Sequence, residues 1–118
     1  MKKYIAVFTG SPNSPQGQRW RKLDEATRNA RMAEGMKAWH GWHAKHASVV
    51  VDHGGPLSKT KRVTADGIAD ISNNLSGFTI VQAESQEAAA KLFENHPHFS
   101  IFPGDGVEIM EIMPIPQM

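Results

Sequence analysis

Residues 76–95, SGFTIVQAESQEAAAKLFEN, contain a strand followed directly by a short helix. The first nine residues are rich in β-branched and aromatic side chains, which is typical of a strand. Ser85 can cap the helix that follows, and Glu87 in the first turn suits the positive end of the helix dipole. The stretch therefore predicts a strand over 76–84 and a helix over 85–95.

The rest of the chain continues this alternation of strands and helices. An apolar run that stops at Gly10 predicts a strand over 3–10. The proline-free stretch 16–46 predicts one long helix or two abutting helices, with a break near 27–29 where Asn29 would cap the second. The remaining segments are predicted as a strand over 47–52, a turn over 53–57, a short extended segment over 60–67 and a last strand over 106–116.

Two strand–helix units, each returning to the sheet through a strand, predict an α+β fold of the ferredoxin-like type, an antiparallel sheet with helices on one face. In residues 4–9, 78–83 and 107–113, apolar side chains fall on both alternating faces. Helices on one side would leave the other side apolar and in contact with water. We therefore expect a homodimer that packs sheet on sheet and buries about 1,500 Å² or more.

The composition is that of an ordinary globular protein, and it narrows the choice of partners. The 118 residues suit a single domain over 1–118, with 40% apolar and 21% charged residues. The formal net charge is only +1 and the basic residues are scattered, so we expect neither nucleic acid nor a membrane as a partner. The chain has no cysteine, and no apolar run near its start is long enough for a signal peptide, which predicts a cytoplasmic protein.

Three histidines lie one turn apart in the second half of the long helical stretch. On a helical projection, one side carries apolar residues and two of the histidines: Met32, Met36, Trp39, Trp42, His43 and His46. His40 lies at the margin of this side. An imidazole in partly apolar surroundings near a carboxylate can act as an acid or a base near neutral pH. The alternative is a histidine at the edge of the core, bonded to a backbone carbonyl. His40 and His46 project about 120° apart, and the chain has neither an HExxH motif nor a cysteine, so no metal site is expected.

Asp52 ends the predicted second strand and precedes two glycines and a proline. Its carboxylate can orient a nearby imidazole. The equally open alternative is an Asx-type turn, in which the carboxylate accepts a hydrogen bond from the amide of one of these glycines. The two glycines also allow close approach of a ligand to the backbone, which makes Pro56 a candidate ligand contact.

The stretch 94–106, ENHPHFSIFPGDG, places two histidines around a proline. Pro97 keeps His96 out of the α region, so the preceding helix must end at or before Asn95. Ending a helix does not require histidine on both sides, although a charge on His96 would favour the helix C-terminus. His98 has less structural reason to be there. The loop that follows has room for a ligand or a partner subunit.

Three segments taken together resemble the YCII-related group of the dimeric α/β barrel superfamily: WHGWHAKHASVVVDHGGPLSKTKRVTADGIAD (39–70), SGFTIVQAESQEAAAKLFENHPHF (76–99) and VEIMEIMPIP (107–116). The resemblance implies the ferredoxin-like fold with dimerisation through the sheet. Much of this group has no assigned activity. Some relatives are proposed to use a His–Asp pair in lyase chemistry on small molecules, such as dehydrochlorination, and others lie beside sigma-factor genes. For the helix histidine of the enzymatic relatives His40 is the nearest candidate, and the DGPF tetrapeptide of a sister subgroup is absent.

These observations predict a cleft between the long helix and the sheet that binds a small organic molecule. In an enzyme of the lyase or isomerase type, one imidazole would take a proton from carbon or oxygen, Asp52 would orient that imidazole, and another imidazole would donate a proton without any cofactor. The candidate catalytic residues are His43, Asp52, His96 and His98, and the candidate ligand contacts are Trp39, His40 and Pro56. The alternative is a non-catalytic binding or regulatory module that grips a ligand or a protein through the same cleft or the loop after His96, for which the resemblance suggests a link to sigma-factor regulation.

Overall fold

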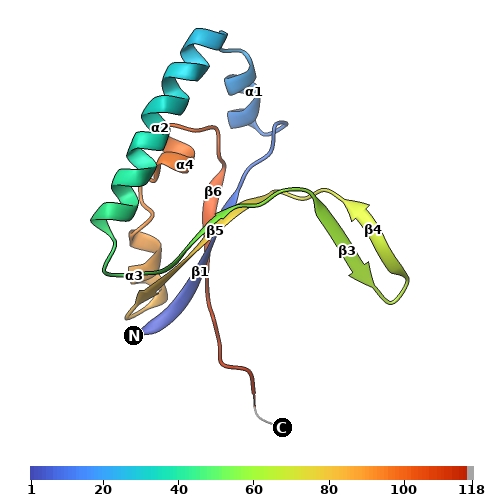
Figure 1. The fold of residues 1–118 in the computed structure, drawn as a ribbon, viewed down its shortest axis with the longest axis vertical. Helices are drawn as coiled ribbons and strands as arrows, with labels where there is room; N and C mark the ends of the chain where they lie inside the picture. The colour runs from blue at the N-terminus through green and yellow to red at the C-terminus, as the bar shows by residue number, and fades with distance from the viewer. Residues whose placement is uncertain (117–118) are drawn as a thin grey trace.

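The computed structural model describes residues 1–116 and shows strands that alternate with helices along the chain (Figure 1). The elements in chain order are β1 (Lys2–Thr9), α1 (Pro15–Arg21), α2 (Glu25–Lys45), β2 (Val50–Pro56), β3 (Thr60–Thr64), β4 (Gly67–Ile71), β5 (Leu75–Ala83), α3 (Gln86–Lys91), α4 (Pro97–Ser100) and β6 (Gly106–Glu111). None of these helices is both long enough and apolar enough to cross a membrane.

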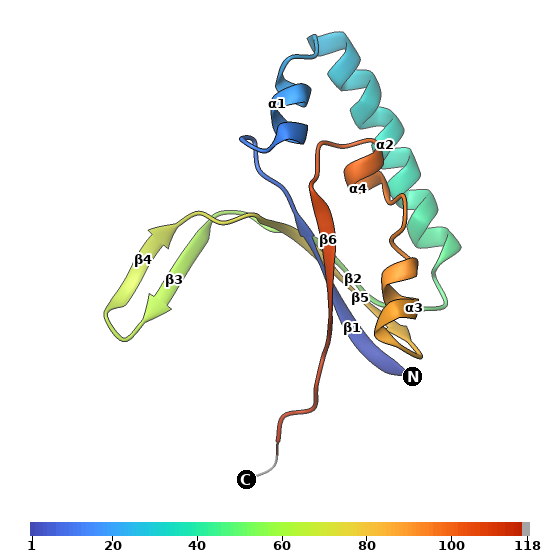
Figure 2. The same cartoon turned by 180° about the vertical axis from the view of Figure 1, so that it is seen from behind.

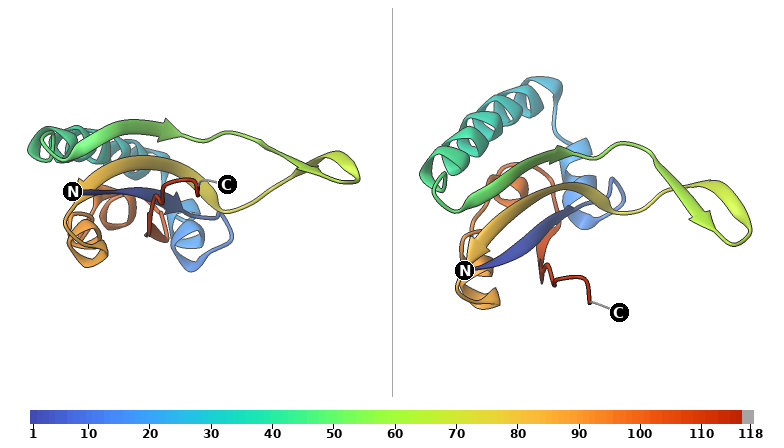
Figure 3. Two further views of the ribbon diagram at one scale, coloured as in Figure 1. Left: turned by 90° about the horizontal axis from the view of Figure 1, so that it is seen from below. Right: turned by 60° about the horizontal axis from the view of Figure 1, so that its bottom comes forward.

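Four strands form one sheet in the order β2-β5-β1-β6, and every neighbouring pair is antiparallel. The helices all lie on one side of this sheet, and the other side is uncovered (Figures 1 and 2). The predicted α+β fold of the ferredoxin-like type is therefore confirmed. The remaining two strands, β3 and β4, pair with each other and project away from the sheet as a hairpin, which we call the β3–β4 arm (Figure 3).

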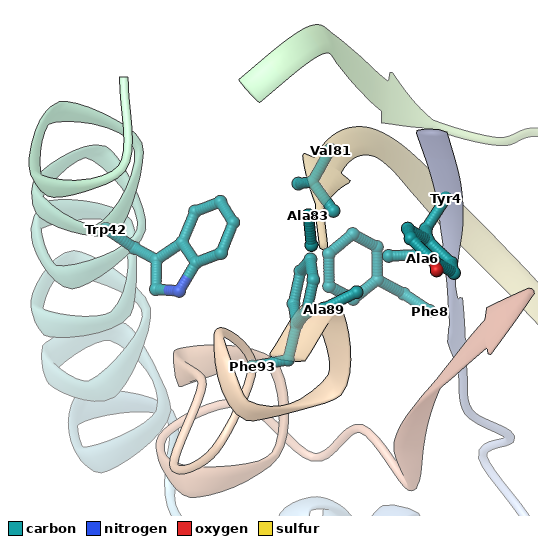
Figure 4. Packing of buried hydrophobic residues seen from close by; sticks show 8 residues of the cluster. All are labelled: Tyr4, Ala6, Phe8, Trp42, Val81, Ala83, Ala89 and Phe93. Carbon is teal, nitrogen blue, oxygen red and sulfur yellow. The ribbon is translucent and has the colours of Figure 1, made fainter. Parts of the chain in front are cut away.

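The core lies between the sheet and the helices, because alternate residues of the central strands point to the helix side. Its buried members are Tyr4, Ala6 and Phe8 from β1, Val81 and Ala83 from β5, Trp42 from α2, and Ala89 and Phe93 from α3 (Figure 4). Cross-strand partners share one face of a sheet, so the pairs Ile5–Ile80 and Val7–Phe78 lie together on the opposite side. We call this side the open face.

The break in the long helical stretch lies at residues 22–24, earlier than the predicted break near 27–29. Asp24 is the extended residue that precedes α2, and Asn29 lies inside the helix. The guanidinium of Arg28 explains the position, because it donates to the carbonyl oxygens of Arg21 and Leu23. These bonds satisfy carbonyls that the end of α1 leaves without helical partners.

The predicted turn over 53–57 is wrong, because most of this stretch belongs to β2. The strand continues past two irregularities in its pairing with β5, one between Val50 and Asp52 and one between Asp52 and Gly55. Gly54 makes this path possible: its φ is +63°, and a Cβ there would collide with the carbonyl oxygen of Phe78. The extended segment predicted over 60–67 is also incomplete, because β4 follows it and completes the arm.

The buried side of α2 agrees with the predicted one at Trp42 and Trp39 and differs from it at the methionines. Met32 and Met36 are 42% and 49% exposed, whereas Gly35 and Trp42 are buried. The reason is a close approach at Gly35, where an added Cβ would lie 2.5 Å from the ring of Phe102. The helix is therefore turned so that its glycine, not its methionines, faces the core.

We predict opposite effects for the two glycines inside α2. G35A should lower the free energy of unfolding by about 1–3 kcal/mol, because the new methyl group overpacks against Phe102. G41A should raise it by about 0.5–1 kcal/mol, because nothing lies within 4 Å of a Cβ there and alanine favours the helix. Urea denaturation followed by tryptophan fluorescence measures both. A stabilised G35A would contradict the packing described for α2.

Candidate functional site

The segment after α3 places two histidines beneath the sheet. α3 ends at Lys91, and the chain turns through Asn95, whose φ is +57°, to His96. His96 is extended, with φ −60° and ψ 142°, as predicted from the proline that follows it. Its Nδ1 accepts a hydrogen bond of 3.0 Å from the backbone N–H of His98. His96 is therefore the N-cap of the short helix α4, and not only a residue that ends the preceding helix.

His98 ties this segment to β1. Its Nε2 lies 2.7 Å from the carbonyl oxygen of Thr9, so that nitrogen carries the proton and donates. The backbone carbonyl of His98 accepts from the amide of Gly104 at 2.9 Å. A Cβ on Gly104 would collide with the imidazole, so glycine is needed there for the ring to lie against the backbone. The bond to Thr9 and the contact with Gly104 hold the imidazole of His98 in one orientation.

Aromatic rings surround His96. Its ring centroid lies 4.6 Å from that of Trp39, 5.1 Å from that of Trp42 and 5.1 Å from that of Phe8. Burial lowers the pKa of His96 to about 3, with a smaller contribution from the charge of His98, and burial also lowers the pKa of His98. Both imidazoles are neutral at pH 7. Since Nδ1 of His96 is an acceptor, its proton is on Nε2, which is buried and has no hydrogen-bond partner among residues 1–116.

A second pair of imidazoles lies where α2 passes over β2. Nδ1 of His43 is 2.9 Å from Nδ1 of His53, and the ring centroids are 4.6 Å apart. The backbone of His53 is fixed from below, because its carbonyl accepts a 2.8 Å hydrogen bond from the buried hydroxyl of Thr79. Burial, followed by the neighbouring charge of His53, lowers the pKa of His43.

This contact defines the protons of the pair when both rings are neutral. One Nδ1 must carry a proton and the other must accept it, so the first ring has a free lone pair on Nε2 and the second has a proton on Nε2. The pair therefore offers one base and one acid, joined by a hydrogen bond. His53 is not among the residues predicted for the site, and the signal in the sequence that points to it is its position directly after Asp52, at the end of the predicted strand.

Asp52 lies apart from these imidazoles. Its pairing with Ile80 places it on the open face, and its carboxylate accepts a 2.8 Å hydrogen bond from the amide of Gly54. The Asx-type turn considered for this residue is confirmed. No hydrogen bond joins the carboxylate to an imidazole in the described part of the chain. The predicted arrangement of Asp52 beside a histidine is therefore not present.

The other candidate residues are divided between the interior and the surface. Trp39 contacts both His96 and His98, with ring centroids 4.6 and 6.0 Å away. His40 is exposed on the surface of α2, and Pro56 is exposed at the end of β2. In residues 1–116, no three histidine, aspartate or glutamate side chains are grouped so that they could hold a metal ion.

Trp42 connects the two histidine pairs. Its ring lies 5.2 Å from that of His43 on one side and 5.1 Å from that of His96 on the other, and its indole N–H donates to the carbonyl of Leu92 at 2.9 Å. Trp42 also borders a surface groove of about 460 Å³ between α2 and the α3–α4 segment. His46, whose ring lies 4.7 Å from that of Trp42, borders the same groove. This volume is large enough for a small organic molecule.

Comparison with solved structures gives an informative likeness. The structure is similar to that of 5-chloro-2-hydroxyhydroquinone dehydrochlorinase (TftG) from Burkholderia phenoliruptrix AC1100, solved in complex with 2,5-dihydroxybenzoquinone. The TM-score is 0.55 and the identity 15%, over 94% of this chain and 93% of that chain. The likeness shows a shared fold. No protein-family model and no curated protein matches the chain.

We predict that the buried histidines make stability depend on pH. In the unfolded chain the pKa of a histidine is about 6.5, whereas burial in the folded chain lowers the pKa of His96 to about 3. The stability that depends on neutral His96 is complete above about pH 6.5 and is lost as the pH falls towards 3, by about 1.4 kcal/mol per pH unit and up to about 5 kcal/mol in all. Urea denaturation at pH 7.5, 6.0 and 5.0 measures the loss.

The variant H96N tests the assignment to this residue. The Oδ1 of asparagine can still accept from the N–H of His98, so the cap is kept while the titrating group is removed. H96N should show a smaller loss of stability between pH 7.5 and 5.0 than the parent, whereas H40N, which changes an exposed histidine, should match the parent. An unchanged loss in H96N would contradict the burial of a neutral imidazole here.

Proposed function

We propose that the chain is a dimeric enzyme that moves protons on a small organic molecule without a cofactor, in a reaction of the lyase or isomerase type. The observation that carries the proposal is the 2.9 Å contact between Nδ1 of His43 and Nδ1 of His53. Further support comes from the resemblance to the YCII-related group and from the shared fold with a dehydrochlorinase.

The proposed proton path begins at the imidazole of the pair with the free Nε2 lone pair. That nitrogen removes a proton from carbon or oxygen of the substrate, and the electron pair left behind forms a new double bond. The Nδ1 proton of the same ring passes to the Nδ1 of the other ring, whose Nε2 proton goes to the atom of the substrate that gains it or to the leaving group. Protons balance, and the pair ends with its two tautomers exchanged, so that exchange of the two Nε2 sites with solvent must restore the first arrangement before the next cycle.

In this proposal His53 takes the place at His43 that the sequence suggested for Asp52. His96 and His98 are then positioning residues, because both are neutral, buried and fixed by backbone hydrogen bonds. His96 acts on His43 through Trp42, which contacts both rings at similar distances, and His98 acts by donating its backbone N–H to His96.

We predict that H43A and H53A each lower turnover by about 10²-fold or more, because each removes one end of the proton path. The measurement is exchange of solvent deuterium into a panel of enolisable ketones and hydroquinones, followed by proton NMR. H40A is the matched control on the same helix and should keep parental rates, since His40 is exposed and outside the pair.

The pH dependence of the exchange rate gives a second check on the same pair. Burial lowers the pKa of His43, so its base form should persist below pH 6.5 and the acid limb of the profile should lie below that value. Compounds that bind without any exchange, with H43A and H53A binding them like the parent, would contradict the enzyme and favour a ligand-binding module.

We also propose that two copies pack through the open face. The half-buried side chains of Ile5, Val7, Phe78 and Ile80 lie there, and Met110, which pairs with Ile5, is 43% exposed. A contiguous apolar surface of this kind is characteristic of an interface. With overall dimensions of 56 × 42 × 19 Å, the chain is a thin slab whose broad sides are large enough for a stable contact.

Size-exclusion chromatography with light scattering tests the dimer. The parent should have about twice the 13.0 kDa mass of one chain. I5D should run as a monomer at micromolar concentration, because a carboxylate would be buried in the centre of the contact. M32D changes an exposed methionine on the helix side and should remain dimeric. A parent chain that is monomeric at 100 µM would refute the proposed contact.

A further inference from the structure

The β3–β4 arm has one apolar side that nothing in its own ladder covers. Val63 and Ile68 are cross-strand partners and are 74% and 71% exposed. Since partners share a face, the two side chains lie together, and the Lys61–Asp70 pair lies beside them on the same side with its ions 2.6 Å apart. All residues from 61 to 70 are exposed. The arm therefore presents a small apolar centre with a charged border, the usual arrangement of an interface.

The arm lacks the support that a two-stranded ladder needs. A hairpin of this size is marginally stable in water unless a third strand or another surface packs against it. Apart from the backbone ladder, the side-chain interactions of the arm are exposed: the Lys61–Asp70 pair, whose side chains are 69% and 83% exposed, a hydrogen bond from the amide of Asp66 to Thr64, and one from Asn73, just after the arm, to Thr60. Exposed pairs of this kind contribute little. A surface outside the chain is the remaining source of stability for the arm.

The direction of the arm indicates which surface this is. Figures 1 and 2 show the arm leaving the sheet on the side away from the helices, and the segment after β6 leaves on that side too. In this segment Met113 is 67% and Ile115 is 90% exposed. The arm and this segment therefore flank the open face, and a body that covers the open face would contact both.

We propose that the β3–β4 arm of each copy closes around a second copy of the chain, with Val63 and Ile68 packed against the partner. This inference rests on the proposed dimer and adds to it a specific clasp. A second copy is the occupant that fits best, because the arm is on the same side as the open face and has the same apolar character. In a two-fold dimer each arm would reach the partner, so a single substitution changes two contacts. A net charge of +1 leaves two copies free to approach each other.

Two double variants on opposite sides of one hairpin test the clasp. V63D/I68D places charge on the apolar side, and R62D/A69D makes an equal number of Asp substitutions at the neighbouring paired positions on the other side. We expect analytical ultracentrifugation to show a dimer dissociation constant raised by about tenfold or more in V63D/I68D and by less than threefold in R62D/A69D. Circular dichroism checks that both variants keep the parental fold.

The outcomes separate the clasp from the dimer. A parent chain that is monomeric refutes both. A dimeric parent whose two double variants dissociate equally refutes the clasp and leaves the sheet contact standing.

Thiol labelling gives an independent measurement on the arm, because the chain has no cysteine. V63C introduces one thiol into the apolar side of the arm, and M32C introduces one at an exposed position of α2 as the control. The thiol of V63C should react slowly at 100 µM protein and faster on dilution, while that of M32C should react at one rate throughout. A concentration-independent rate for V63C equal to that of M32C would refute the clasp.

Discussion

The burial of two neutral imidazoles under the sheet is the constraint on which the rest of the structure depends. His98 donates to the carbonyl of Thr9 at the end of β1, and its own N–H is held by Nδ1 of His96. These bonds bring the chain after α3 against Phe8, whose ring lies 5.1 Å from each imidazole. The helix side of the sheet is thereby covered by a layer of planar rings, those of Phe8, His96 and His98. α2 packs closely against these rings at two positions. Trp39 contributes an aromatic ring that contacts Phe8, and Gly35 has no side chain and so leaves room for Phe102.

Ring contacts continue from this layer, through Trp42, to the pair of histidines near the surface. Trp42 lies between His96 and His43, and its indole N–H donates to the carbonyl of Leu92. These contacts fix the distance between the C-terminal end of α2 and the strand β2. At this distance Nδ1 of His43 is within hydrogen-bond reach of Nδ1 of His53. Burial lowers the pKa of both His96 and His98, so both imidazoles are neutral near pH 7, and their ring nitrogens are turned to the interior. The contact between His43 and His53 is exposed to solvent, and its protons are the ones that we propose to take part in chemistry.

The sequence predicts the order and type of most elements because these depend on local patterns, the alternation in β1 and β5 and the cap at Ser85. It fails where a single residue changes the geometry of its neighbours. A hydrophobicity pattern does not predict that Gly35 is buried, yet the close approach of Phe102 to Gly35 decides which side of α2 faces the core. The bulges around Asp52 have no local signature either, and a shift of one residue in a strand moves each side chain to the other face. That shift sends Asp52 to the open face and brings His53 to the helix side. β4 was missed because its residues pair only with β3, so neither strand has a buried face to impose a pattern.

The two faces of the sheet have different proposed roles, and β2 connects them. His53 lies on the helix side with the proposed proton path, whereas Asp52 lies beside Ile80 on the side proposed to meet a second copy. The strand turns from one to the other within Asp52–Gly54, where the carboxylate binds the amide of Gly54 and the glycine adopts a positive φ. A second copy on the open face would enclose this bulge and limit its motion. Because the bulge sets the orientation of His53, the proposed assembly and the proposed chemistry would be coupled through three residues of one strand.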